Sequence, residues 1–486
     1  MKKLLVFVLS LFLLILIIIL YNTLTYRSKQ VSIQSITLPE LNKDAANSLS
    51  KAIRFKTISY EDDINRDSAE FIKFHSFLTI AYPFVDSLLE KTVINEYSLL
   101  YKWIGSNPDL DPIILMAHQD VVPVDRSSIN KWPYDPFGGK IANDTIYGRG
   151  SLDDKGSLMA ILESVEWLLE KQFKPRRTIY LAFGHDEEIG GVNGAKRIAA
   201  YLHNQNVKAE TILDEGLVIA RGMVPGIHQD VAMIGIAEKG FVTIELSIEQ
   251  EPGHSSTPKR ESAIDILADA ITKLHKNQRP AFISQPLQQF LEYIGPEMPF
   301  IEKMIFANTW LFKPLLINIY EGSAGGNASV RTTTALTIFQ SGIKENIMPS
   351  NARAVVNFRI IPDETIAMIK DHVIDVIDDK RIQVRIMEGF QNEPSPVSPT
   401  SSYGFEIINK TFHEVFPDII SAPSLMVGGS DTKHYHNISE SIYRIIPIPV
   451  SDLTLSSIHG INERIAIKDY ENAIQYYIRL IENFNK

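Results

Sequence analysis

Short apolar segments alternate with amphipathic segments over residues 113–216, and this alternation is the feature that most restricts how the chain can fold. The apolar segments at 113–117, 178–183 and 211–213 predict strands, and the amphipathic segments at 156–172 and 193–205 predict helices. Strands that alternate with helices predict an α/β layer fold, with a mostly parallel sheet flanked by helices.

A different pattern begins near residue 240. Residues 241–250 alternate with a period of two, as in a sheet with one exposed face. The elements predicted after them are a helix at 262–276, strands at 329–338 and 352–360, a helix at 364–377 and a strand at 382–387. The order β-α-β-β-α-β predicts a split βαβ unit. Residues 277–320, rich in proline and aromatic residues, receive no predicted element.

The α/β pattern resumes after residue 390 and ends in an amphipathic helix at 467–484. We therefore expect one α/β domain, formed by residues 42–240 and 391–486, that is interrupted by a smaller α+β domain at 241–390. The chain of 486 residues is long enough for this organisation.

The N-terminus begins with Lys2 and Lys3 and continues with an apolar run at 4–20, which only Ser10 interrupts. The run ends without a small-residue cleavage site, which favours an uncleaved signal-anchor at 1–20 over a signal peptide. We expect a juxtamembrane spacer at 21–41. By the positive-inside rule the rest of the chain would lie on the non-cytoplasmic side of the membrane, and it would be secreted if the segment were cleaved.

The composition excludes two kinds of chemistry. The formal net charge is −10 at pH 7, which argues against a nucleic-acid partner. The chain has no cysteine, so neither a disulfide nor a thiolate ligand is available. Any metal site must therefore be built from imidazole and carboxylate groups.

Such groups follow each of the three predicted strands. His118 and Asp120 follow the first strand, Glu187 and Glu188 the second, and Asp214 the third. Carboxyl ends of parallel strands meet at one edge of a sheet, where ligands bind. Taken singly, the acids at 186–188 are better explained as caps of the next helix. Together, these groups suit Zn²⁺, with Co²⁺ or Mn²⁺ as alternatives.

Six motifs resemble one known family. They are MAHQDVVPV, GRGSLDDKG, HDEEIGG, LDEG, GHSS and HGINERI, in this order along the chain. The sequence is similar, from about residue 45 to its end, to the co-catalytic zinc metallopeptidases that include carboxypeptidase S, glutamate carboxypeptidase, the aminoacylases and succinyl-diaminopimelate desuccinylase. GGSDTKHY and the long GRGSLDDKGSLMA resemble most the carboxypeptidase S and N-fatty-acyl-amino-acid hydrolase branch.

The resemblance implies two zinc ions per chain, bound by the α/β domain as the catalytic domain. Asp153 would bridge the two ions. His118 and Asp214 would complete the ligands of one ion, and Glu188 and His459 those of the other. The insert at 241–390 would be a lid and a dimerisation domain.

The resemblance also implies roles for residues that bind no metal. Glu187 would be the general base. Asp120 would lie behind the His118 imidazole, fix its tautomer and raise its basicity. His254 in the insert would stabilise the oxyanion, either within the chain or across a homodimer. The Asp153–Asp154 peptide bond is expected to be cis.

The expected activity is hydrolysis of an amide next to a free α-carboxylate, in a short peptide or an N-acyl amino acid. Arg331, Arg359, Asn327 and the backbone at Gly429 are candidates for binding that carboxylate. A solvated charge on a strand is an equally good explanation of the two arginines. The alternatives are an aminopeptidase or dipeptidase of the same fold, a catalytically dead metal-binding protein and a membrane-tethered solute-binding protein.

Overall fold

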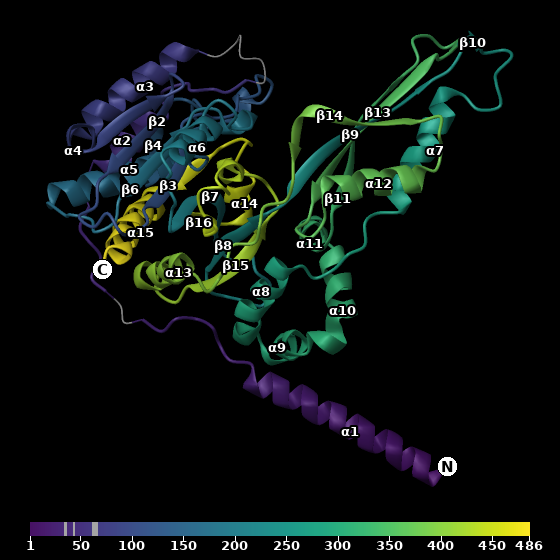
Figure 1. Cartoon of the computed structure of the whole chain (residues 1–486), viewed down its shortest axis with the longest axis horizontal. Helices are drawn as coiled ribbons and strands as arrows, with labels where there is room; N and C mark the ends of the chain where they lie inside the picture. Colours follow the sequence, from purple (N-terminus) through teal and green to yellow (C-terminus); the bar gives the residue numbers. More distant parts are fainter. Residues whose placement is uncertain (34–35, 42–43, 61–66) are drawn as a thin grey trace.

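The computed structural model describes residues 1–33, 36–41, 44–60 and 67–486. The predicted domain boundary at residue 42 and residues 34–35 of the predicted spacer lie outside this described part. Two sheets of different size dominate the architecture, and the larger one carries the strands of the α/β pattern (Figure 1).

The larger sheet has eight described strands in the order β1-β2-β6-β3-β7-β16-β8-β15. Their bounds are β1 (Glu90–Ile94), β2 (Ser98–Trp103), β3 (Ile113–His118), β6 (Ile179–Gly184), β7 (Thr211–Ala220), β8 (Val231–Glu238), β15 (Ile420–Met426) and β16 (Ile442–Val450). β3 pairs in parallel with β6 and β7, β7 with β16, and β8 with β15. β1 and β2 form an antiparallel edge. β16 and β8 are also antiparallel, so four of the seven neighbouring pairs are parallel and the predicted, mostly parallel mixed sheet is confirmed.

Helices cover both faces of this sheet, and β3 shows why its sequence is apolar throughout. Ile113, Leu115 and Ala117 pack into the core beneath one group of helices, and Ile114 and Met116 pack on the opposite face. The first group comprises α2 (Ala45–Ala52), α3 (Ser68–Ala81), α4 (Pro83–Leu88), α5 (Lys155–Glu170), α13 (Tyr403–Val415) and α15 (Ile467–Phe484). The opposite face is covered by α6 (Ala195–Asn204). Burial on both faces leaves no position for an alternating polar residue.

The smaller sheet has the order β11-β13-β9-β14, with every pairing antiparallel. Its strands are β9 (Gly240–Glu249), β11 (Thr333–Ser341), β13 (Asn351–Ile360) and β14 (Gln383–Asn392). α7 (Ala263–Lys276) and α12 (Ile366–Ile377) bury one face in a separate core. The short strands β10 (Gly253–His254) and β12 (Ile347–Met348) pair at the tip, far from the larger sheet (Figure 1).

Residues 277–320, which had no predicted element, are largely helical. They form α8 (Gln285–Ile294), α9 (Phe300–Ala307) and most of α10 (Thr309–Glu321). α11 (Ala324–Val330) follows, so the strand predicted at 329–338 is wrong in its first residues and begins at Thr333. Ser323 caps α11 by accepting a hydrogen bond from the Gly326 N–H, and this local bond outweighs the alternating pattern.

The remaining elements lie at the N-terminus and near the strand ends. α1 (Lys2–Thr25) extends away from the body and contacts it at α9 (Figure 1). Among the described helices it is the one that is long and apolar enough to cross a membrane. A small sheet of β4 (Lys140–Ala142), β5 (Thr145–Tyr147) and β17 (Arg464–Ala466) and the short helix α14 (Asp452–Leu455) complete the α/β part.

Candidate metal centre

Four of the five predicted metal ligands lie in direct contact at the carboxyl edge of the larger sheet. His118 ends β3, Asp153 lies in the loop before α5, Glu188 follows β6, and His459 lies in the loop after α14. Asp153 Oδ1 lies 2.9 Å from His118 Nε2, and its Oδ2 lies 3.0 Å from His459 Nε2. His459 Nε2 also lies 3.0 Å from Glu188 Oε2. The Asp153 carboxylate thus touches both imidazoles, one with each oxygen.

The arrangement suits a cation. One ligand atom each from His118, Asp153 and Glu188 lies within 4.8 Å of the others. These are imidazole and carboxylate groups, the ligands that zinc takes where no thiolate is present. The peptide bond between Asp153 and Asp154 is cis, as expected.

Asp214, the fifth predicted ligand, lies in β7 and is buried. Its Oδ2 accepts no hydrogen bond within the described part of the chain. Burial raises the pKa of this carboxyl to about 6. A buried carboxylate oxygen without a donor is costly unless a cation or a proton satisfies it. The residues present therefore fit the divalent ions that the motifs imply.

The protonation of the imidazoles leads to the same conclusion. Burial disfavours the charged form of His118, but hydrogen bonds to Asp120 and Asp153 outweigh it and hold the pKa well above its usual range. Hydrogen bonds to Asp153 and Glu188 raise the pKa of His459 to about 10. Without a metal, these carboxylates attract protons onto both imidazoles. The carboxylates of this cluster therefore need a positive charge to balance their own, and a metal ion would supply it.

Asp120 is fully buried and connects the strand end to the acidic turn. His118 Nδ1 lies 3.0 Å from the backbone oxygen of Asp120 and 3.3 Å from its Oδ1. The same carboxylate accepts hydrogen bonds from the backbone N–H groups of Glu187 and Glu188, each at 3.2 Å, and from Ser59 Oγ at 2.6 Å. Asp120 therefore orients an imidazole and also holds the backbone of both glutamates in place.

The acidic triplet after β6 is divided between two roles. Asp186 accepts hydrogen bonds from the N–H groups of Asn193 and Gly194 at 2.8 and 2.7 Å, just before α6. Glu187 and Glu188 instead form a short 3₁₀ turn, η3 (Glu187–Ile189). Burial raises the pKa of Glu187 to about 8. Asp186 thus holds the loop that leads into α6, but the N-cap of α6 is Gly194 and no side chain caps it, so the capping explanation is wrong for all three acids.

Glu463 was not singled out from the sequence, although it lies inside HGINERI. It is fully buried and forms an ion pair with the buried Arg149 at 2.6 Å. Glu463 also accepts hydrogen bonds from the N–H groups of Gly150, Leu152 and Asp153, at 3.1, 2.8 and 3.1 Å. It therefore fixes the backbone of the loop that presents Asp153. Its position four residues after His459 is the sequence feature that could have indicated a role at the site.

We expect Glu463→Gln to destabilise the fold by about 3–5 kcal/mol, because Arg149 would keep a buried charge without a counterion. Metal affinity should fall by about 10–100-fold, since the loop of Asp153 loses its support. Urea unfolding and metal titration measure the two effects. The control is Glu471→Gln, which removes an exposed pair with Lys468 and should cost less than about 1 kcal/mol. Equal effects of the two variants would contradict a positioning role.

His254 lies far from this cluster. It is exposed in β10 at the tip of the smaller sheet, and its Nδ1 lies 2.7 Å from Ser256 Oγ (Figure 1). The fold does not bring it to the carboxyl edge of the larger sheet within this chain.

The candidates for carboxylate binding lie around the junction between the two sheets, where Lys239 Nζ donates to the carbonyl oxygens of Ala328 and Arg331 at 2.8 and 2.7 Å. Arg331 follows α11 and already forms an ion pair with Glu321. Arg359 lies in β13 with its guanidinium 5.3 Å from the centre of the Phe241 ring, and no ion pair of it is found among the described residues. Asn327 lies in α11, half-buried, and Gly429 is exposed in the loop after β15.

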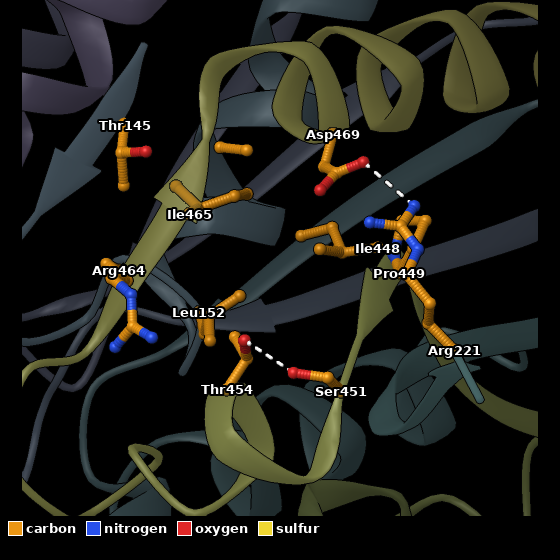
Figure 2. Close-up of a pocket in the computed structure, with 11 residues that line it drawn as sticks. Thr145, Leu152, Arg221, Ile448, Pro449, Ser451, Thr454, Arg464, Ile465 and Asp469 are labelled. Carbon is orange, nitrogen blue, oxygen red and sulfur yellow. Dashed lines mark hydrogen bonds and ion pairs between the residues drawn. The ribbon is translucent and has the colours of Figure 1, made fainter. Parts of the chain in front are cut away.

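A cavity of about 220 Å³ lies elsewhere, between the three-stranded sheet of β4, β5 and β17 and the start of α15 (Figure 2). Arg221 and Asp469 on its wall form an ion pair at 3.4 Å, and Ser451 bonds to Thr454 at 3.2 Å. None of the predicted metal ligands lines it. This cavity is therefore separate from the candidate metal centre.

An α/β sheet with imidazole and carboxylate groups at its carboxyl edge is an arrangement suited to a metal-dependent hydrolase. The chain belongs to the peptidase family M20/M25/M40, whose profile matches residues 114–483. Its fold is the M20 fold: the M20 family metallo-carboxypeptidase Sso-CP2 from Sulfolobus solfataricus superposes with a TM-score of 0.66 at 20% identity, over 91% of this chain and 100% of that one.

Two curated relatives are similar over most of their length. The chain is 41% identical over 483 residues to the probable carboxypeptidase S-like 2 of Dictyostelium discoideum, covering 97% of this chain and 92% of the relative. It is 42% identical over 445 residues to the N-fatty-acyl-amino acid synthase/hydrolase PM20D1 of Xenopus tropicalis, covering 91% and 86%. The resemblance seen in the motifs is confirmed, and the chain is a metal-dependent hydrolase of the carboxypeptidase or N-acyl-amino-acid hydrolase kind.

Proposed function

We propose that this protein is a membrane-anchored dizinc hydrolase that cleaves an amide bond next to a free α-carboxylate. Its substrates would be short peptides or N-acyl amino acids, which fits the names of the relatives. The observation that carries the proposal is the Asp153 carboxylate, which contacts His118 with one oxygen and His459 with the other. A carboxylate placed in this way is suited to bridge two ions.

We assign Asp153 to both ions, His118 and Asp214 to one, and Glu188 and His459 to the other. Zinc is the proposed metal, and Co²⁺ or Mn²⁺ are possible substitutes, because the ligand types suit all three. Bound at this edge, two such ions would polarise the scissile carbonyl, lower the pKa of the attacking water and keep Glu187 ionised.

Glu187 is the proposed general base. It is the first residue of η3, the turn that also contains Glu188. Glu187 would take a proton from the attacking water and pass it to the leaving amine. Asp120 would hold the Glu187 backbone and the His118 ring during both transfers.

His254 is the proposed donor to the oxyanion that forms on the substrate carbonyl. Its distance from the metal centre within one chain supports a contribution across a homodimer, formed through the smaller sheet and its helices. In this arrangement residues 241–390 act as a lid and dimerisation domain. Residues 42–240 and 391–486 form the catalytic domain.

The substrate carboxylate needs a cationic or N–H donor. Arg359 is the better supported candidate, because Arg331 is already paired with Glu321. Asn327 and the backbone at Gly429 remain secondary candidates. α1 is the proposed membrane anchor, with the catalytic domain on the non-cytoplasmic side.

A matched substrate set tests the proposed reaction. The full-length, zinc-loaded protein is given an N-acyl amino acid, the same compound with its carboxylate converted to an amide, and a dipeptide with and without a blocked α-amine. Product amine is measured for each. We expect conversion of the carboxylate to an amide to lower kcat/KM by about 10²-fold or more, because a charged donor would lose its partner.

Other results would point to the alternatives. A requirement for the free α-amine would identify an aminopeptidase or dipeptidase. Equal cleavage of the acid and its amide would contradict carboxylate recognition. No hydrolysis of any compound with zinc supplied would identify a metal-binding protein without activity.

A further inference from the structure

The two helices α9 and α10 present an apolar surface to the outside of the molecule. Six large side chains on them are between 42% and 65% exposed, and we call this set the apolar helical face: Phe300, Ile301, Trp310, Leu311, Leu315 and Ile319. Exposed side chains of this size and number are unusual on a soluble protein, and they mark an interaction surface.

The opposite side of α10 is packed into the body. Leu316 is buried against a core that contains Leu287, Leu291 and Val330. At 100° per residue, the exposed residues of α10 in the apolar helical face span about half of its circumference. α10 is thus apolar on two sides: its inner side is anchored in this core, and its outer side is exposed. An exposed apolar side of this kind is suited to contact the interface of a bilayer.

The occupant of this face is indicated by α1, which joins the body at the turn between α9 and α10. Asn22 Nδ2 donates to Asn308 Oδ1 at 2.9 Å, and Asn308 Nδ2 donates to the Ile19 carbonyl oxygen at 3.2 Å. Asn308 is fully buried and lies two residues before Trp310. Tyr26, just after α1, donates to the Leu291 carbonyl oxygen at 2.8 Å. Any lipid around the last turns of α1 therefore reaches the apolar helical face.

The charges around the face do not favour a particular lipid charge. Lys303 and Lys313 are accompanied by Glu302 and Glu321 on the same two helices. Burial of apolar area would therefore drive the contact, and Trp310 is of the residue type enriched at the membrane–water interface. A zwitterionic membrane is a sufficient partner.

We propose that the apolar helical face inserts into the interface of the bilayer that α1 enters, so that the body rests on the membrane through α9 and α10 as well as through α1. This rests on the proposed role of α1 as a membrane anchor. The proposal assigns a lipid surface as the partner of residues 277–320, for which the sequence predicted no helix or strand.

The absence of cysteine makes a direct test possible, because one introduced cysteine labels a single position. Ile301→Cys and Leu315→Cys are each labelled with an environment-sensitive fluorophore in the full-length chain and reconstituted into phosphatidylcholine vesicles that carry a spin-labelled lipid. Leu9→Cys in α1 reports the anchor, and Ile80→Cys in α3, which is 80% exposed, is the matched control. Zinc-dependent hydrolysis by each variant confirms that it is folded.

We expect the lipid quencher to reduce the fluorescence at 301 and 315 several-fold more than at 80, and about as much as at 9. Quenching at 9 with none at 301 and 315 overturns the proposal and leaves the anchor intact. Absence of quenching at 9 as well overturns both. A blue shift at 301 and 315 that persists in detergent, with chemical cross-linking between labelled chains and no lipid quenching, would show that a second copy covers the face.

Discussion

Glu187→Gln is expected to lower kcat by about 10²–10⁴-fold while the chain keeps two metal ions. The amide has the shape of the carboxylate but cannot accept a proton from water, so binding survives and proton transfer fails. Metal content by atomic emission and steady-state kinetics on the best substrate measure the two quantities. KM should change little, because Glu187 is not expected to contact the substrate in the ground state.

Glu188→Gln is the matched comparison, one residue further along the same turn. Glu188 lies 3.0 Å from His459 and is assigned to a metal, so its loss should reduce the metal content as well as the rate. Excess zinc should partly rescue Glu188→Gln and not Glu187→Gln. If Glu187→Gln retained full turnover, the assignment of the general base would be wrong.

Asp153→Asn should have the second large effect, a loss of both ions and of detectable activity. Asp153 contacts His118 and His459 at 2.9 and 3.0 Å, so both halves of the proposed centre depend on it. A neutral amide offers one weaker oxygen ligand and cannot balance the charge of two cations. Added zinc should raise the melting temperature of the wild type and leave that of Asp153→Asn unchanged.

Asp154→Asn is the control for this variant. Asp154 is fully buried, and its Oδ2 accepts a hydrogen bond from the His118 N–H at 3.3 Å. The side-chain oxygen of asparagine can accept the same hydrogen bond. We expect the metal content of Asp154→Asn to stay close to that of the wild type. Retention of two ions by Asp153→Asn would contradict the bridging role.

Three strands of the larger sheet, β3, β6 and β7, could be predicted because their signal is local, although β7 continues to Ala220, beyond its predicted end at residue 213. Residues 113–117 are buried on both faces in the structure, and an unbroken apolar run is what such burial requires. The C-terminal helix at 467–484 begins and ends where its amphipathic pattern does. The helices α8 to α10 were missed because proline and aromatic residues obscure the helical period, and α10 contains Pro314.

The ligand types and their order were also readable from the sequence. Imidazole and carboxylate groups at successive strand ends are local facts, and the absence of cysteine is a fact of composition. The sequence by itself thus determined an α/β chain with groups able to bind cations at one sheet edge.

Only the tertiary structure decided which of these groups contact one another and which residues hold them in position. Glu463 supports the loop of Asp153 from more than 300 positions away, and the Asp120 carboxylate holds the N–H groups of both glutamates. His254 lies at the far tip of the smaller sheet, and the apolar helical face lies beside α1. These relations arise from strand order and helix packing, which bring distant segments together, and no local pattern of residues encodes them.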